Sequence, residues 1–134
     1  MLTGRMEGGF ADLITRMIAS KGMDFHIVAL KPSVSPSGEV FASTMAFKQA
    51  LLRDIVVTYS DAAELRIYED RPKHVKVFRE FFDDLNTTLT SPSSGLTASR
   101  RPITTEVIQV TEQEAVMDPV SEVAEVQALS LIHI

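Results

Sequence analysis

The chain alternates short runs of β-forming residues with longer segments in which apolar residues recur at helical spacing. This alternation constrains the fold more than any single motif. Residues 2–5 have the pattern of a strand end and a turn, and residues 24–30 and 64–68 have that of buried strands. Helices are expected at residues 7–21, 43–59 and 72–85. Strands that alternate with helices form a parallel sheet covered by helices on both faces, so the sequence predicts an α/β fold.

Residues at the ends of the predicted helices carry the expected start and stop signals. Gly22 is placed to end the first helix, Ser43 or Thr44 can cap the second, and Pro72 suits the first turn of the third. The residues expected on the buried faces are Phe10, Leu13, Ile14, Met17 and Ile18, then Phe47, Leu51, Leu52, Ile55, Val56 and Tyr59, then Val75, Phe78, Phe82 and Leu85.

The second part of the chain is less regular. Residues 86–101 are polar and rich in serine and threonine, which predicts a flexible loop. Residues 102–110 predict an added strand, antiparallel at a sheet edge. Asp118 as N-cap and Pro119 at the first helical position predict a last helix, whose periodic residues are Val120, Val123 and Val126.

These patterns predict one domain built from residues 1–85, with residues 102–128 as a strand–helix extension of it. The final residues 129–134 read LSLIHI, which resembles the translation of an adapter sequence used in library preparation. We expect this hexamer to be a sequencing scar and exclude it from the fold. The alternative is a genuine apolar C-terminus.

Composition excludes several classes of function. A chain of 134 residues is long enough to form a hydrophobic core. Its net charge of −5 argues against a generally basic surface of the kind that coats nucleic acid. The absence of cysteine excludes disulfides and thiolate sites. No apolar run is long enough to span a membrane and no secretory leader opens the chain, so we expect an intracellular protein, cytoplasmic or nuclear.

Polar residues that suit phosphate chemistry fall at the predicted carboxyl ends of the strands, where α/β sheets bind their ligands. Thr3, Lys31 and the pair Glu69–Asp70 are all placed there. Carboxylates are oxygen ligands of the kind that Mg²⁺ prefers. The alternative for Glu69 and Asp70 is that they stabilise the positive end of the helix that begins near Pro72.

The other candidates have equally plain alternatives. Thr3 and Gly4 offer a hydroxyl and a backbone N–H to a phosphoryl oxygen and Arg5 adds a guanidinium, yet the three residues also suit an ordinary turn. Lys31 and Lys48 compete as the lysine that offsets phosphate charge, and most lysines are simply solvated. The remaining polar residues left open are His26, His74, Arg100 and Arg101.

Three motifs in order, LTGR, FK on a predicted helix and IYEDR at a strand end, resemble the haloacid dehalogenase (HAD) superfamily. The longer run from LTGR through DFHIVALKPS, STMAFKQALL and RIYEDRPKHVKVFREFF, with the later PITTEVIQV and MDPVSEVAEVQ, carries a narrower resemblance. The run is most similar to the HAD domain of the Swiss Army Knife RNA-repair-like proteins, a mainly fungal family, and the similarity covers most of residues 2–127. The resemblance implies a HAD-like Rossmannoid fold of three layers with a parallel sheet. It also implies a Mg²⁺-dependent phosphohydrolase that acts on nucleic-acid ends or nucleotides in RNA repair.

The resemblance also implies roles for individual residues. Thr3 and Lys48 match the hydroxyl and the lysine that contact the transferred phosphoryl group, with Lys31 as the alternative lysine. Glu69 and Asp70 match the acids that hold Mg²⁺. The residues implied in substrate binding are Gly4, Arg5 and Arg71, while the role of His74 stays open.

One departure from the family's pattern affects catalysis. The superfamily's first motif, an Asp-x-Asp pair that supplies the nucleophile, does not occur in the sequence. It would precede residue 1, so we expect a fragment whose fold is incomplete at the N-terminus and which is inactive as written. The alternative is a non-catalytic HAD-like module for binding or scaffolding. The substrate, expected to be phosphorylated RNA or a nucleotide, and the oligomeric state do not follow from the sequence.

Overall fold

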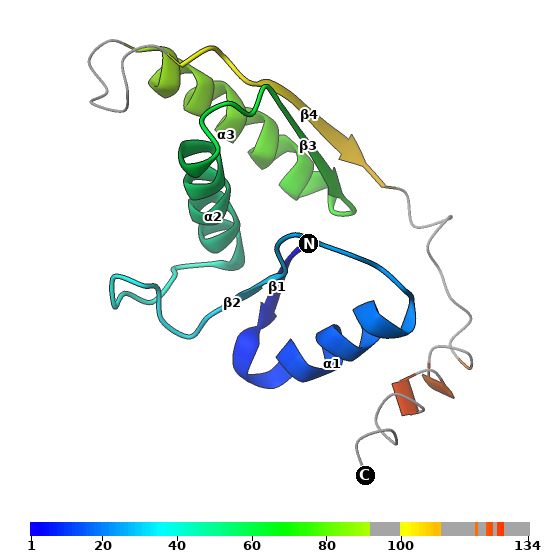
Figure 1. The fold of residues 1–134 in the computed structure, drawn as a ribbon. Coiled ribbons are helices and arrows are strands. Elements are labelled where there is room, and N and C mark those ends of the chain that lie inside the picture. The colour runs from blue at the N-terminus through cyan, green and yellow to red at the C-terminus, as the bar shows by residue number, and fades with distance from the viewer. Residues whose placement is uncertain (92–99, 111–119, 121–122, 125, 128–134) are drawn as a thin grey trace. The chain divides into compact units, whose positions relative to one another are not determined.

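A computed structural model of the chain describes residues 1–91, 100–110, 120, 123–124 and 126–127. Its elements are, in order, β1 (Leu2–Met6), α1 (Glu7–Ser20), β2 (Ala29–Lys31), α2 (Thr44–Thr58), β3 (Glu64–Glu69), α3 (Pro72–Thr90) and β4 (Thr104–Gln109) (Figure 1). The α/β alternation is as predicted. The strands, however, pair as two separate parallel sheets, β1–β2 and β3–β4, in place of the single sheet expected. The chain divides into two compact units, Met1–Lys48 with residues 116–134 and Gln49–Ala115.

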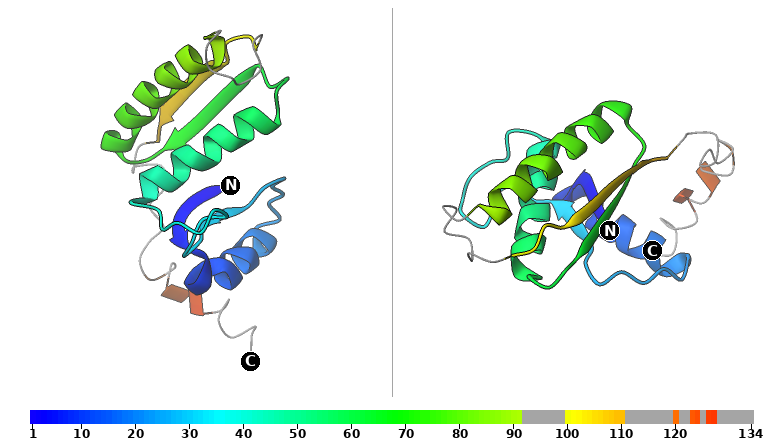
Figure 2. Two further views of the ribbon diagram at one scale, coloured as in Figure 1. Left: turned by 90° about the vertical axis from the view of Figure 1, so that its left-hand side faces the viewer. Right: turned by 90° about the horizontal axis from the view of Figure 1, so that it is seen from above.

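Helix α3 provides most of the core of the second unit. Pro72 stands in its first turn, as predicted. The four residues expected to be buried, Val75, Phe78, Phe82 and Leu85, are buried, and so are Phe81 and Leu89. Phe78 and Phe82 are each only 1% exposed, and their rings stack with centroids 6.2 Å apart. The helix lies along the sheet of β3 and β4, which Figure 2 shows from two further directions.

Strands β3 and β4 run parallel in an unbroken register from Glu64 opposite Thr104 to Glu69 opposite Gln109. The antiparallel pairing expected for β4 is therefore wrong. Helix α3 and the segment after it return the chain to the start of β3, where the N–H of Thr104 donates to the Ala63 carbonyl. Such a return through a crossover helix produces a parallel neighbour.

Helix α3 continues to Thr90, five residues into the segment that composition assigned to a loop. Asn86 explains part of this extension. Its Nδ2 donates to the Ile103 carbonyl at 2.8 Å, and its Oδ1 accepts from the Ile103 N–H at 2.8 Å. One side chain thus satisfies both backbone groups of the residue just before β4 and fastens it to the helix. The remaining predicted loop, residues 92–99, lies outside the described residues.

Arg100 has a structural role in the second unit. Its guanidinium donates to the Val56 carbonyl, and its Nη2 donates to the carbonyls of Tyr59 at 3.2 Å and Ala62 at 2.9 Å. These oxygens lie at the carboxyl end of α2 and just beyond it, where helical carbonyls lack partners within the helix. The structure therefore makes Arg100 a cap for α2, a role that was not predicted from the sequence. Arg101 is exposed.

Helix α1 and sheet β1–β2 belong to the first unit. Gly22 ends α1 as predicted: it has φ of +62°, and its N–H donates to the Ala19 carbonyl at 3.1 Å. The strand expected at residues 24–30 is wrong in extent, because only Ala29–Lys31 pairs with β1. β-propensity does not make a strand without a neighbouring strand to pair with. No residue of α1 is fully buried, so its apolar face is only partly covered.

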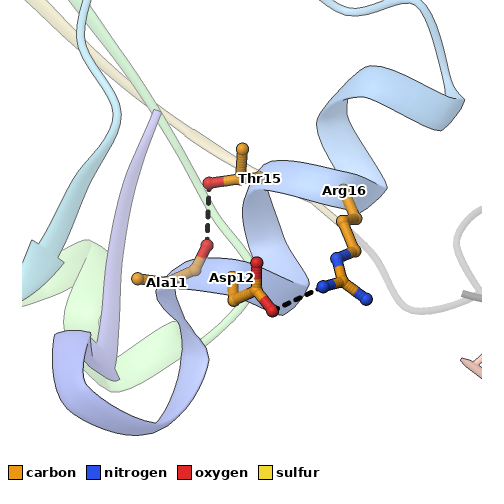
Figure 3. A network of polar contacts seen from close by, with 4 residues as sticks. All are labelled: Ala11, Asp12, Thr15 and Arg16. Atoms are coloured by element: carbon orange, nitrogen blue, oxygen red, sulfur yellow. Dashed lines mark hydrogen bonds and ion pairs between the residues drawn. The ribbon is translucent and has the colours of Figure 1, made fainter. Parts of the chain in front are cut away.

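Figure 3 shows two polar contacts that α1 makes within itself. Arg16 Nη2 contacts Asp12 Oδ2 at 2.7 Å, and Thr15 Oγ1 donates to the Ala11 carbonyl at 2.8 Å. An acid four residues before a base stabilises an isolated helix by roughly 0.3–0.5 kcal/mol. Asp12 thus pairs with a residue of its own helix.

Helix α2 begins as predicted and buries part of the face that was expected to be buried. The Ser43 Oγ accepts from the Ala46 N–H at 3.0 Å, so Ser43 is the capping residue of the two considered. Phe47, Leu52 and Val56 are buried. The expectation that Tyr59 is buried is wrong, because α2 ends at Thr58 and the tyrosine lies beyond the helix, 50% exposed.

The C-terminal part of the chain is described at few positions. Residues 120, 123–124 and 126–127 are helical, and the three periodic valines, Val120, Val123 and Val126, are exposed. Asp118, Pro119 and residues 129–134 lie outside the described residues. Among the described residues, no helix has the length and apolar character needed to cross a membrane.

The contact of Asn86 with Ile103 leads to a test of the extended helix. Replacing Asn86 with alanine leaves the buried carbonyl and N–H of Ile103 without a hydrogen-bond partner. We therefore expect the free energy of unfolding to fall by about 1–3 kcal/mol. Urea denaturation followed by circular dichroism measures the change, with Thr87→Ala, one position along on the exposed side, as the control. Equal stability of the two variants would show that Asn86 does not hold β4.

Candidate functional site

The turn between β3 and α3 carries four of the polar residues singled out from the sequence, Glu69, Asp70, Arg71 and His74. Glu69 is the last residue of β3, and its carbonyl accepts from the Val110 N–H at 3.0 Å. Arg71 is the N-cap residue of α3. The turn therefore stands at the carboxyl end of the β3–β4 sheet, as predicted, because both strands end there in register.

Glu69 is buried, with only 5% of its surface exposed, and its carboxylate faces the start of α3. Its Oε1 accepts from the Arg71 N–H at 3.2 Å, and its Oε2 lies 3.6 Å from His74 Nδ1. Both oxygens therefore contact the first turn of α3. This is the capping arrangement that was weighed against metal binding.

His74 lies on the first turn of α3 with about a fifth of its side chain exposed. Its Nδ1 is buried and has no hydrogen-bond partner within the described part of the chain. The imidazole is therefore turned toward Glu69 and helps to enclose it.

Asp70 differs from Glu69 because it is exposed. Asp70 lies in sequence between the buried Glu69 and the exposed Arg71. Mg²⁺ keeps several waters and needs only one or two protein carboxylates, so Asp70 fits such an ion in its donor chemistry. No group of three or more His, Cys, Asp or Glu residues is gathered for a metal ion among the described residues.

Thr3, Gly4 and Arg5 form an irregular segment of β1. Leu2 pairs with Ala29 and Met6 pairs with Lys31, so three residues on β1 stand opposite one on β2. The N–H of Arg5 donates to Thr3 Oγ1 at 3.3 Å within this bulge. Thr3 was expected at the carboxyl end of its strand. It lies instead within β1, where the pairing with β2 is interrupted. Bulges of this kind are frequent beside active sites.

Gly4 lies directly against the start of α2. A Cβ added at Gly4 would overlap the Cγ2 methyl of Thr44 and lie 3.2 Å from both Cβ and Oγ1 of that residue. Only glycine permits this approach. The contact brings the bulge to the amino end of α2, where the helix dipole favours an anion.

The two candidate lysines belong to the same unit as the bulge. Lys48 is half-buried in the second turn of α2, and Lys31 is the half-buried last residue of β2. Arg5 is exposed, and its guanidinium stands over the Phe10 ring at 5.2 Å from the ring centroid.

The structure thus brings the predicted residues together in two groups. The bulge Thr3–Arg5 joins the start of α2, which carries Lys48, and the turn after β3 joins Glu69, Asp70, Arg71 and His74. The two groups belong to different units. The contact between Thr44 and Gly4 was not predicted from the sequence. The only hint of it there is a glycine in one segment and a helix start in another.

The close approach of Gly4 to Thr44 predicts the effect of a paired substitution. Gly4→Ala should lower the free energy of unfolding by about 1–3 kcal/mol, because the added methyl overpacks the contact. Thr44→Ser removes the overlapping methyl and should restore most of that loss in the double variant. Thermal denaturation of the unaltered chain, the two single variants and the double variant measures the coupling free energy between the two positions. Additive effects would show that the two residues do not touch.

The burial of Glu69 predicts a structural effect that needs no metal. Glu69→Ala leaves the Arg71 N–H unpaired and should cost about 1–3 kcal/mol of unfolding free energy in the presence of a chelator. The matched control is Asp70→Ala, which should leave stability nearly unchanged. If Glu69→Ala lowers stability only when Mg²⁺ is present, Glu69 acts as a ligand instead.

Comparisons with known proteins identify the family. No solved structure matches the chain. The chain is 30% identical over 129 residues to the uncharacterized protein YMR265C of Saccharomyces cerevisiae, covering 90% of this chain and 26% of the yeast protein. The chain therefore spans about a quarter of that relative. Residues 1–133 match the family described as HAD domain family 1 in Swiss Army Knife RNA repair proteins, and the chain belongs to this family.

Proposed function

We propose that the chain carries the phosphoryl-binding part of a Mg²⁺-dependent HAD-type phosphohydrolase that acts on nucleic-acid ends or nucleotides. Membership of the HAD family supports the phosphatase class. The observation that carries the proposal is the contact of Gly4 with Thr44, which seats the Thr3 bulge at the amino end of α2. The family's description as RNA repair proteins supports the proposed substrate class.

Residues of the first unit would hold the phosphoryl group. The Thr3 hydroxyl accepts from the Arg5 N–H and keeps its own proton to donate to a phosphoryl oxygen. The N–H groups at the start of α2 add dipolar attraction for the anion. Lys48, one turn further along α2, would offset the charge of the transferred group, with Lys31 at the end of β2 as the alternative.

Residues of the second unit would hold the metal. We assign the direct contact to Asp70, because it is exposed, and we assign to Glu69 the task of fixing the turn that presents Asp70. A Mg²⁺ held at Asp70 would supply positive charge to a phosphate bound at this turn. Arg71, exposed beside Asp70, would contact substrate.

Hydrolysis through a covalent intermediate needs a carboxylate nucleophile. The 134 residues contain no Asp-x-Asp pair, and Asp12 is paired with Arg16 on α1. We therefore expect this chain by itself to bind a phosphoryl group without turning it over. A nucleophile would have to come from sequence beyond these 134 residues.

A non-catalytic binding module is the second candidate. It is favoured by the carboxylate of Glu69, which faces α3 with both oxygens and resembles a structural cap. Such a module would keep the fold without requiring Mg²⁺ at Asp70.

A thermal-shift experiment separates the two candidates. Orthovanadate with Mg²⁺ should raise the unfolding midpoint of the chain, because a ligand at one hundred times its Kd adds about 2.7 kcal/mol of stability. Asp70→Asn should abolish the Mg²⁺-dependent part of this shift. The control is Asp61→Asn, an exposed acid in the turn before β3.

Two outcomes would contradict the proposal. If vanadate and Mg²⁺ leave the midpoint of the unaltered chain unchanged, the chain holds no phosphoryl site and the binding-module reading stands. If the chain hydrolyses a phosphate ester with Mg²⁺ at a robust rate, the expectation of inactivity is wrong and a carboxylate within these residues acts as nucleophile.

A further inference from the structure

One face of the β3–β4 sheet is covered by α3, and among the described residues the opposite face carries mostly exposed side chains. Side chains alternate along both strands, so Leu65, Ile67 and Val107 point toward the helix. Parallel sheets normally have both faces covered, which makes the composition of the open face informative. The residues of this open face are Glu64, Arg66 and Tyr68 on β3 and Thr104, Glu106 and Ile108 on β4.

The amino-terminal half of the open face is charged. The Arg66 Nε lies 2.6 Å from Glu64 Oε1 and 3.3 Å from Glu106 Oε2, and all three side chains are about half exposed. A further layer of protein packed on this face would bury these ions at a large cost in desolvation. The two acids also repel the phosphate backbone of a nucleic acid laid across the whole sheet.

The carboxyl-terminal half of the same face is apolar and carries an aromatic ring. Tyr68 is 66% exposed, and its register partner on β4 is Ile108, which is half-buried. The two side chains lie next to each other on one face, because directly opposed residues of neighbouring strands do so. We call Tyr68 and Ile108 the aromatic platform.

The aromatic platform stands beside the proposed metal turn. Tyr68 precedes Asp70 by two residues, and the buried Glu69 separates them. Alternation places the Tyr68 side chain on the face away from α3, and the exposed Asp70 and Arg71 follow at the end of the strand. A ligand whose phosphate reaches Asp70 and Arg71 would have its organic part beside Tyr68.

We propose that the aromatic platform stacks the nucleobase of a nucleotide, or of the terminal nucleotide of a strand, whose phosphate lies at Asp70 and Arg71. This inference rests on the part of the proposed function that assigns Mg²⁺ to Asp70, and it concerns a phosphate held through that ion, not the transferred group assigned to Thr3 and Lys48. It adds the group that selects the substrate. An exposed tyrosine ring binds any base through its π-face, which gives a preference for nucleotides over small phosphate esters without a preference for sequence. The acidic half of the face limits the ligand to the carboxyl end of the sheet.

Isothermal titration calorimetry of the 134-residue chain with Mg²⁺ tests the inference. The probes are adenosine 5′-monophosphate, ribose 5-phosphate and inorganic phosphate. We expect the adenosine nucleotide to bind about tenfold more tightly than ribose 5-phosphate, because base–aromatic stacking contributes that much or more. Tyr68→Leu, which keeps apolar area but removes the ring, should erase the preference and leave the Kd for inorganic phosphate unchanged.

Two further variants make the result specific. Tyr68→Phe keeps the ring and should keep the preference for the nucleotide. Tyr59→Leu is the matched control, since Tyr59 is the other tyrosine of the chain and is also exposed, and it should have no effect. Circular dichroism of each variant verifies that the fold is retained.

The outcomes distinguish this inference from the function on which it rests. If inorganic phosphate binds but the nucleotide binds no more tightly than ribose 5-phosphate, or Tyr68→Leu changes nothing, the platform is overturned while the phosphoryl site stands. If none of the three probes binds, the phosphoryl site and the platform are both overturned.

Discussion

The packing of α3 against the β3–β4 sheet is the constraint on which the second unit depends. Phe78 and Phe82 are almost completely buried, and full burial of such a side chain contributes about 1.5–3 kcal/mol. This packing fixes the direction in which α3 leaves β3, and therefore the turn that carries Asp70. It also brings the chain back to the start of the sheet, so that β4 must run parallel to β3. The proposed metal turn exists because the core beneath it is closed.

Polar contacts from distant parts of the sequence complete that arrangement. Asn86 satisfies both backbone groups of Ile103, and Arg100 caps the carbonyls at the end of α2. Glu69 connects the last residue of β3 to the first turn of α3. Each of these side chains forms hydrogen bonds with backbone groups that are either buried away from water or located at the end of a helix or strand, where they would otherwise be unpaired. Positions that look like catalytic or linker residues thus hold the scaffold, and the exposed Asp70 and Tyr68 remain for ligands.

The first unit has a weaker core, and its chemistry depends on a close backbone contact. No residue of α1 is fully buried, yet Gly4 approaches Thr44 so closely that no side chain fits between them. A helix start placed against a strand bulge is a suitable seat for an anion, because both offer backbone N–H groups. The proposed phosphoryl site is therefore formed by backbone geometry, which glycine permits, with Thr3 and Lys48 as its side chains.

The sequence by itself determined the helices, their caps and the α3 stripe, because periodicity and capping are local properties: Pro72, Ser43 and Gly22 stand where predicted. The sequence also determined the family, because several short motifs occur along the chain in the order that the family has them. Tertiary structure alone decided strand pairing, since the extent of β2 and the direction of β4 depend on which neighbour is present. It also decided which of Glu69 and Asp70 is buried, because that depends on which side of the turn α3 occupies.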